Sequence, residues 1–285
     1  MAVYSQCRNI EIDASELSSP SSTLPDFIQQ QLKEYAPKYI EEVNGLLEGI
    51  RSTWTGWSVL STIAKLTSKK MVIKPWKKID KNTLSFEQNA TAGPANMVDA
   101  TPQDKMLLAC ADDPSTNSRA NQPLTGTNGD VYRGTGQGSN TEVRFTSEMW
   151  PGGGSSTAGP GAEGSEILFH EMVHGLRQMR GVMQCASTTM NRNFDTREEF
   201  MAILVSNMYR SELHRNGLRA DHHGFQPLPV AMQDASAFLS TYLDYVQQLV
   251  EEDRALAMLL KNVNCEFNPV KAFYDRYPRI FAGGK

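Results

Sequence analysis

The stretch Ile167-Leu-Phe-His-Glu-Met-Val-His-Gly-Leu-Arg-Gln-Met-Arg-Gly181 decides the fold that we expect of this chain. Ser165, just before it, is a suitable helix N-cap, and its final glycine is a residue that commonly ends a helix. Between these two points, apolar side chains recur at helical spacing, at Leu168, Met172, Leu176 and Met179. We therefore predict a helix over about 165–180, with one face in the protein core.

Two histidines and a glutamate lie in the middle of this predicted helix, in the pattern His170-Glu171-Met172-Val173-His174. Residues four apart lie on one face of a helix, so the two imidazoles can reach the same ion. Glu171 lies about 100° around the helix from His170, where it can take a proton from the attacking water and deliver it to the leaving amine. Surface helices with two ordinary histidines also match so short a pattern, but the apolar flanks argue against that. The pattern predicts a zinc-dependent endopeptidase with one Zn²⁺ per chain.

A catalytic zinc site normally has three protein ligands and one open position. One known pattern continues with a glycine three residues and a histidine six residues after the second histidine, but Arg177 and Arg180 stand at those places. That pattern is excluded. Acidic residues near the start of the next predicted helix, about 196–212, remain as candidates for the third ligand; they are Asp195, Glu198 and Glu199.

Among these acidic residues we favour Glu199. The small Ala202, three residues later, would let the second helix approach the first closely. Glu198 is the alternative, because a helical wheel places it nearer the middle of the apolar face. Asp195 is the third choice.

The segments on both sides of the predicted helix indicate the fold class. Before it come short strand-like pieces at 71–76, 83–86, 130–132 and 142–145, and a Gly-rich loop at 151–164. After it, the pattern predicts helices over about 196–212 and 230–263. We expect an α+β fold, with a small irregular sheet before the His-Glu helix and a mainly helical C-terminal half.

Residues 1–24 are rich in serine, proline and small polar side chains, so we expect a flexible leader there that could carry a secretion signal. We expect one metallopeptidase domain over 25–285. Its N-terminal part, 25–128, is helical and irregular, and its catalytic core is 129–285. A helix predicted early in the N-terminal part contains Pro37, which we expect to kink or divide it.

Composition argues against several function classes. The net charge of −4 gives no excess of positive charge for a nucleic-acid partner. No run of about 20 apolar residues indicates a membrane span, and no general secretory signal peptide is visible. The four cysteines are widely spaced, unlike a cysteine zinc site or a dense disulfide framework. The expected partner is a protein or peptide substrate.

Two further regions are candidates for substrate contact. The alternating segment 142–146 could be an edge strand that pairs with extended substrate by β-augmentation. His222 and His223 could donate a hydrogen bond to the tetrahedral oxyanion, and Arg219 and Tyr209 are rival donors. Each of these four side chains is also compatible with a structural role.

From about Gly129 onward the chain resembles the NleD-type family of bacterial type III effector zinc metallopeptidases. The blocks that carry the resemblance are EVRFTSEMW at 142–150, the Gly-rich stretch, ILFHEMVHGLRQMRG at 167–181, TREEFMAILVSNMYRSE at 196–212 and LRADHHGF at 218–225. The first 128 residues match no family that we can place, so substrate selection stays open.

The resemblance implies a zincin-like fold and a gluzincin-like site, in which His170, His174 and a downstream glutamate bind zinc and Glu171 is the base. In the related clostridial neurotoxin proteases, the ligand is the second glutamate of a Glu-Glu-Leu block, which corresponds to Glu199 here. Family members are injected by bacteria into host cells, where some cleave signalling kinases. The resemblance therefore implies a secreted virulence effector that acts on a host signalling protein in the host cytosol. The alternative is a non-catalytic, zinc-stabilised effector that binds a host protein, in which four protein ligands hold the ion.

Overall fold

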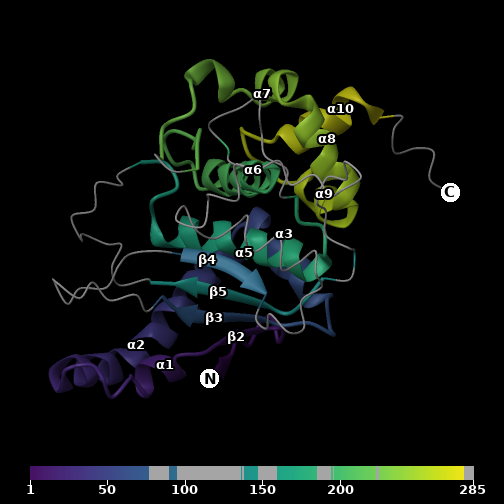
Figure 1. Ribbon diagram of the computed structural model, residues 1–285. Helices are drawn as coiled ribbons and strands as arrows, with labels where there is room; N and C mark the ends of the chain where they lie inside the picture. Colours follow the sequence, from purple (N-terminus) through teal and green to yellow (C-terminus); the bar gives the residue numbers. More distant parts are fainter. Residues whose placement is uncertain are drawn as a thin grey trace, which may run out of the picture.

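The computed structural model describes residues 1–76, 90–94, 136, 138–146, 159–184, 194, 196–222 and 225–278. Within these residues the elements are β1 Ala2–Val3, β2 Ile10–Ile12, α1 Ser15–Ser18, α2 Asp26–Arg51, α3 Trp54–Ala64, β3 Met71–Pro75, β4 Ala90–Pro94, β5 Thr141–Phe145, α5 Gly164–Arg180, α6 Arg197–Glu212, the 3₁₀ turn η1 Val230–Met232, α7 Ala235–Thr241, α8 Leu243–Glu252, α9 Arg254–Leu260 and α10 Pro269–Arg276. They form a mixed α+β fold, as expected (Figure 1). The predicted strands at 83–86 and 130–132, and most of the Gly-rich loop, lie outside the described residues.

A five-stranded sheet in the order β1-β2-β3-β5-β4 forms one layer of the molecule. The three inner strands run parallel to one another, and both outer strands are antiparallel to their neighbours. Buried residues alternate along β3 and β5, where Ile73 and Val143 are opposite one another in register. The structure thus confirms the strands predicted at 71–76 and 142–145, and the alternation noted over 142–146 agrees with the burial pattern of β5.

β5 is an inner strand, so the prediction that 142–146 is an edge strand that pairs with substrate is wrong. β3 lies on one side of β5 and β4 on the other. Among the described residues, β4 is the outer strand on this side of the sheet. Its sequence, ATAGP, has a single β-branched residue, so propensity gave no reason to predict a strand that covers β5.

Residues 2–18 are part of the fold, in contrast to the flexible leader expected over 1–24. β2 lies between β1 and β3, and the side chains of Ile10 and Ile12 are fully buried in the core. The expectation rested on the serines and prolines of this segment. It missed a short apolar strand whose burial in the sheet offsets the entropy lost on ordering the chain.

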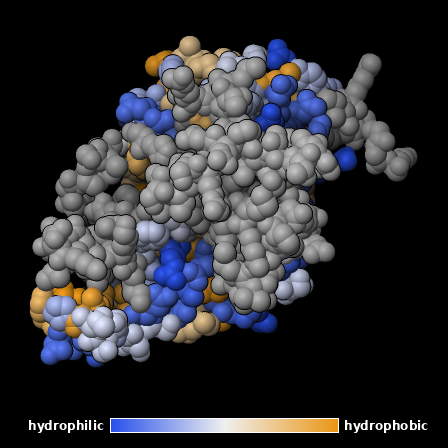
Figure 2. Space-filling model, in the orientation of Figure 1, coloured by the Kyte–Doolittle hydropathy of each residue, from blue (hydrophilic) through white to orange (hydrophobic). Residues whose placement is uncertain are grey.

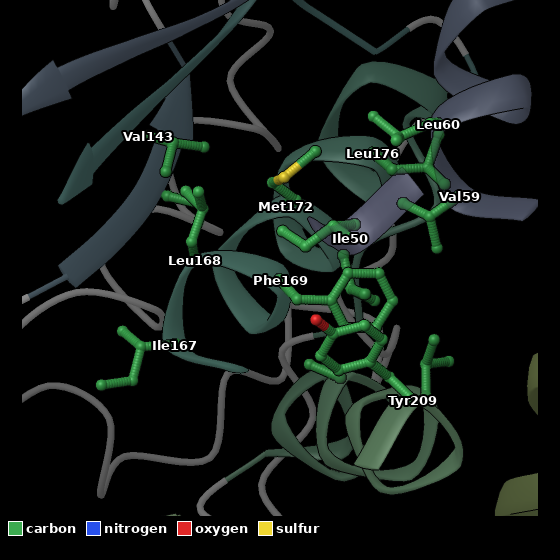
Figure 3. Packing of buried hydrophobic residues seen from close by; sticks show 14 of the residues in the cluster. Ile50, Val59, Leu60, Val143, Ile167, Leu168, Phe169, Met172, Leu176 and Tyr209 are labelled. Carbon is green, nitrogen blue, oxygen red and sulfur yellow. The ribbon is translucent and has the colours of Figure 1, made fainter. Parts of the chain in front are cut away.

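α5 lies between the sheet and α6 (Figure 1). On one side, Leu168 lies near Val143 of the sheet; on the other, the ring of Phe169 packs on Tyr209 of α6 with centroids 4.6 Å apart (Figure 3). The predicted apolar stripe of this helix is fully buried. α6 runs back along α5, so its first turns meet the middle of α5.

Gly175 lets α5 approach the sheet closely. A Cβ at this position would lie 2.7 Å from Cε of Met71 and 3.2 Å from Cγ2 of Thr141. A larger side chain here would have to push aside the end of the Met71 side chain and press on Thr141. The residue before this glycine is His174, so the same close contact fixes the height of a predicted metal ligand above the sheet.

The ends of the two central helices are well defined. The N-cap of α5 is Glu163, two positions before the predicted cap Ser165, and the helix begins at Gly164. It ends as predicted at Gly181, which has a left-handed φ of 69°. Thr196 caps α6 by accepting a hydrogen bond from the backbone N of Glu199. This cap fixes the first turn of α6, which carries the acidic candidates.

α2 is one continuous helix, and Pro37 does not divide it. The proline lies on the exposed face, while Leu32 and Tyr39 on either side of it are buried in the core. Packing of the helix on both sides of the proline compensates for the lost backbone hydrogen bond.

One hydrophobic core extends from the N-terminal strands to the last helix. None of the described helices combines the length and apolar character needed to cross a membrane. In the view of Figure 2, the coloured surface over the C-terminal helices shows both hydrophilic and hydrophobic residues. Large apolar side chains exposed among the described residues are Met1, Val3, Phe27, Trp54, Trp57, Val230 and Met258.

We predict that Ile10→Ala lowers the free energy of unfolding by about 2–5 kcal/mol, because it removes buried volume from a strand inside the sheet. Val3→Ala, at an exposed position of β1, is the matched control and should change this free energy by less than about 0.5 kcal/mol. Urea denaturation followed by circular dichroism measures both. Equal midpoints for the two variants would mean that the first strands are a detached leader after all.

Candidate metal centre

α5 places the two histidines of the motif one helical turn apart, with both rings buried. Nε2 of His170 and Nε2 of His174 lie 3.1 Å from one another. The rings are nearly perpendicular, at 85°, with centroids 4.7 Å apart. The two imidazoles thus offer their outer nitrogens to the same point, as the motif predicted.

α6 brings Glu199 to the same point. Its Oε2 lies 3.2 Å from Nε2 of His170, and its Oε1 lies 3.3 Å from Nε2 of His174. Glu199 is 4% exposed, so the carboxylate reaches this point within the protein interior. We refer to His170, His174 and Glu199 as the metal triad.

The geometry of the metal triad fits a metal ion. Ligands that bind zinc at about 2.0–2.1 Å with tetrahedral angles lie roughly 3.3 Å from one another. The two Nε2 atoms lie 3.1 Å apart, and each has one oxygen of Glu199 at a similar distance, Oε2 at 3.2 Å from His170 and Oε1 at 3.3 Å from His174. Two imidazoles and one carboxylate also form the ligand set of one class of catalytic zinc sites. The buried His-His-Glu group could therefore hold a metal ion.

The protonation of the metal triad shows how its charge is balanced. Burial lowers the pKa of His170 to about 3, so this ring is neutral and has a lone pair for an ion. Burial also opposes the charge of His174, but Glu199 and Glu198 outweigh it and raise its pKa well above the usual value. His222 and His174 hold the pKa of Glu199 well below its usual range, against the effect of burial. A proton on His174 therefore occupies the place that a cation would take.

Glu198, the alternative ligand, is directed elsewhere. Its two oxygens accept hydrogen bonds from Nε of Arg177, at 2.7 and 2.9 Å, and Oε2 also accepts from the backbone N of Gln184 at 3.0 Å. Its nearest approach to the metal triad is 3.5 Å, between Oε1 and Nδ1 of His174. The structure thus brings Glu199, and not Glu198, to the two Nε2 atoms.

Glu171 lies on α5 beside the metal triad, and its side chain is half-buried. Its negative charge contributes to the raised pKa of His174 and acts on Arg219 as well. The carboxylate therefore shares the electrostatic environment of the triad.

His222 reaches the metal triad from the turn after α6. Its Nε2 lies 3.3 Å from Oε2 of Glu199, and its ring is nearly parallel to that of His170, with centroids 6.4 Å apart. About a quarter of its side chain is exposed. This histidine is the candidate donor that combines contact with the triad and access to solvent.

Arg219 is buried near the metal triad, but its guanidinium binds the backbone of the loop to which it belongs. Its guanidinium donates hydrogen bonds to the backbone oxygens of Asp221 and His222 and lies 4.4 Å from the ring centre of Phe225. Asn207 of α6 holds the Arg219 backbone through both its N–H and its carbonyl. Burial lowers the pKa of Arg219, although Glu199 opposes this effect. Arg219 therefore fixes the backbone that carries His222.

The remaining predicted residues lie away from the metal triad or outside the described residues. Tyr209 is buried in the core against Phe169, ten residues after Glu199, which is about 15 Å along the helix. This position argues against a direct contact between its hydroxyl and the oxyanion. Asp195 and His223 lie outside the described residues.

Arg177 is the residue beside the site that sequence reasoning missed. It is fully buried and binds Glu198. An arginine one turn after His174 in a helix with so many apolar residues was the available signal, since a buried guanidinium requires a carboxylate partner. Glu198, the alternative candidate for the third ligand, could have been assigned to Arg177 as this partner.

Comparison with known proteins gives a family match. The family model Peptidase_M91, described as an effector protein, matches residues 26–238, which is more than half of the chain. Comparisons with curated proteins and with solved structures gave no match. The matched segment contains α5 and α6, and hence all residues of the metal triad, and it ends before α8.

We predict that the metal-free protein binds one equivalent of Zn²⁺ and releases a proton as it does so. His174 has a raised pKa and is protonated at neutral pH, so the ion must displace its proton, and binding should weaken as the pH falls. Calorimetry in buffers of different ionisation enthalpy measures the proton count. Glu199→Ala should weaken binding at least about 100-fold, whereas His214→Asn, at an exposed histidine, should not. Affinity independent of pH, or unaffected by Glu199→Ala, would contradict the site.

Proposed function

Because the chain belongs to the Peptidase_M91 family of effector proteins, we propose that it is a zinc-dependent endopeptidase that cleaves a peptide bond in a protein of a host cell. The observation that carries the proposal is the buried metal triad, in which two helices bring two imidazoles and one carboxylate to a common point. Its three protein ligands leave one position of a tetrahedral ion for chemistry. A mixed nitrogen and oxygen set without thiolate suits zinc, and we assign one ion per chain.

His170, His174 and Glu199 would hold the ion in this mechanism. Bound there, zinc supplies a positive charge that polarises the scissile carbonyl and lowers the pKa of the attacking water. Glu171, half-buried on the same helix, takes the proton of that water and delivers it to the leaving amine. Burial of the triad excludes bulk water and strengthens each of these interactions.

His222 is our candidate for stabilising the negative oxygen that develops on the substrate. It lies beside Glu199, is partly exposed, and is held by a turn that Arg219 braces. A donor fixed before the reaction needs no reorganisation when charge develops. Arg219 acts through this turn and through its charge.

Extended substrate could pair with the outer edge of β4. This strand replaces β5 as the candidate for β-augmentation, because it is the outer strand next to α5 among the described residues. The residues of β4 are mostly small, which would let a second strand approach this edge closely.

Our proposal for the place of action is supported by the description of the family as effector proteins and by the resemblance to NleD-type peptidases. We propose that a bacterium delivers the protein into the host cytosol, where the substrate is a signalling protein such as a kinase. The rival is a non-catalytic effector in which zinc only stabilises the fold. In that case a fourth protein ligand would close the site, and within the part of the chain that the structure describes His222 is a candidate, because its Nε2 lies beside Glu199.

We predict that Glu171→Gln lowers proteolysis by at least about 10²–10⁴-fold and leaves Zn²⁺ binding intact, because the change removes the general base and none of the ligands. Mass spectrometry of new N-termini in host-cell lysate, comparing wild type with this variant, would identify the substrate and measure the loss. Glu163→Gln, at an exposed N-cap of α5, is the control. New N-termini at equal levels for wild type and Glu171→Gln would contradict the role of Glu171 as the general base.

His222→Ala separates the enzyme from its rival. As an oxyanion donor, His222 contributes about 10²-fold to kcat, and its loss should leave zinc affinity within a few-fold of wild type. Loss of zinc as complete as in Glu199→Ala would instead identify a fourth ligand and favour the structural role. Steady-state kinetics and a zinc-chelator competition give both quantities on the same preparation.

A further inference from the structure

A chain of buried charges lies behind the metal triad. Arg177 holds both oxygens of Glu198 through Nε, and its side chain is fully buried. A second nitrogen of the same guanidinium donates to Oε2 of Glu252 at 3.1 Å and to the backbone oxygen of Val182 at 2.8 Å. The arginine thus connects α5 with the first turn of α6 and with the end of α8.

His174 lies between the two adjacent glutamates of α6. Its Nε2 is 3.3 Å from Glu199, within the metal triad, and its Nδ1 is 3.5 Å from Oε1 of Glu198. An imidazole that offers Nε2 to an ion carries its ring proton on Nδ1, and the group facing Nδ1 sets the orientation of the ring. Nδ1 of His174 is buried without a hydrogen bond, so a small approach to Glu198 would satisfy it.

We propose that Glu198 is the positioning residue of His174, and that Arg177, anchored by Glu252, holds Glu198 in place. The proposal rests on the proposed metal site, because it assigns Nε2 to the ion and Nδ1 to the proton. It gives the two neighbouring glutamates separate tasks: Glu199 binds the ion, and Glu198 orients a ligand.

The anchor lies beyond the family match. The match ends at residue 238, whereas Glu252 ends α8, and its Oε1 also accepts hydrogen bonds from Gln184 and Gln248. A second link runs from Arg180 of α5 to the buried Asp253, at 2.6 Å. The C-terminal helices of this chain therefore support the helix that carries both histidines, and the positioning chain depends on them.

A purely structural role for this ion pair makes a different prediction. A buried ion pair can often be replaced by uncharged side chains of similar shape without loss of stability, whereas removal of one partner leaves the other charge buried and unpaired. If the pair only joined α5 to α6, the neutral replacement would restore both folding and metal binding. If Glu198 positions His174, the neutral replacement restores folding alone.

The test measures Zn²⁺ affinity by chelator competition, with circular dichroism as the check of folding, for the full-length wild type, for Glu198→Leu, which removes the acceptor that faces Nδ1 of His174, and for the double variant Arg177→Met with Glu198→Leu. Glu251→Gln, an exposed carboxylate of α8, is the matched control. We expect the folded double variant to bind Zn²⁺ about 10–100-fold more weakly than wild type and the control. A folded double variant with wild-type affinity overturns the proposal.

A measurement on the wild type keeps the proposal testable if these variants do not fold. In ¹⁵N-histidine-labelled protein loaded with Zn²⁺, nuclear magnetic resonance should show His174 protonated at Nδ1 and bound to the ion through Nε2. Ligation through Nδ1 overturns the positioning role and leaves the metal site standing. Wild-type protein that binds no Zn²⁺ overturns the proposed function instead, and this inference with it.

Discussion

The buried charge of Glu199 is the constraint on which the rest of this structure depends. A carboxylate in the protein interior needs a positive partner, and Arg177 on the neighbouring helix is already engaged by Glu198. Among the described residues, the groups paired with Glu199 are the histidines His170, His174 and His222. Two of them project from α5, one turn apart, so the site is balanced either by a proton on His174 or by a metal cation. The pairing of α5 with α6 is thus both a packing contact and a charge balance.

Close packing of α5 against the sheet and against α6 fixes the positions of the charged groups. Gly175 lets α5 lie against β3 and β5, and the tight contact of Phe169 with Tyr209 joins α5 to α6 on the other side. Between these contacts, the two Nε2 atoms and the carboxylate of Glu199 lie close enough together to hold a metal ion. The surrounding helices, including those after the family match, hold α5 through ion pairs at its C-terminal end. A rigid support of this kind is what an electrostatic catalyst requires.

The sequence was sufficient for the features that depend on local pattern. Helical spacing around His170 predicted α5, and the acidic turn after it led to Glu199, which the structure places at the triad. Features that depend on contacts distant in sequence were not accessible. The strand β2 has three residues, too few for a periodic signal, and β4 consists of small residues, so the N-terminal leader and the edge position of β5 were wrongly predicted. The sequence could not decide between Glu198 and Glu199 as the residue beside both histidines, because that depends on where Arg177 lies in the folded protein.

Zinc K-edge X-ray absorption on the purified full-length protein tests the central claim most directly, because multiple scattering counts the imidazoles bound to the ion. The account predicts one zinc per chain with two imidazoles, further oxygen ligands at about 2.0–2.2 Å and no sulfur. A shell with three imidazoles and a fourth protein ligand, or with thiolate sulfur, would contradict it.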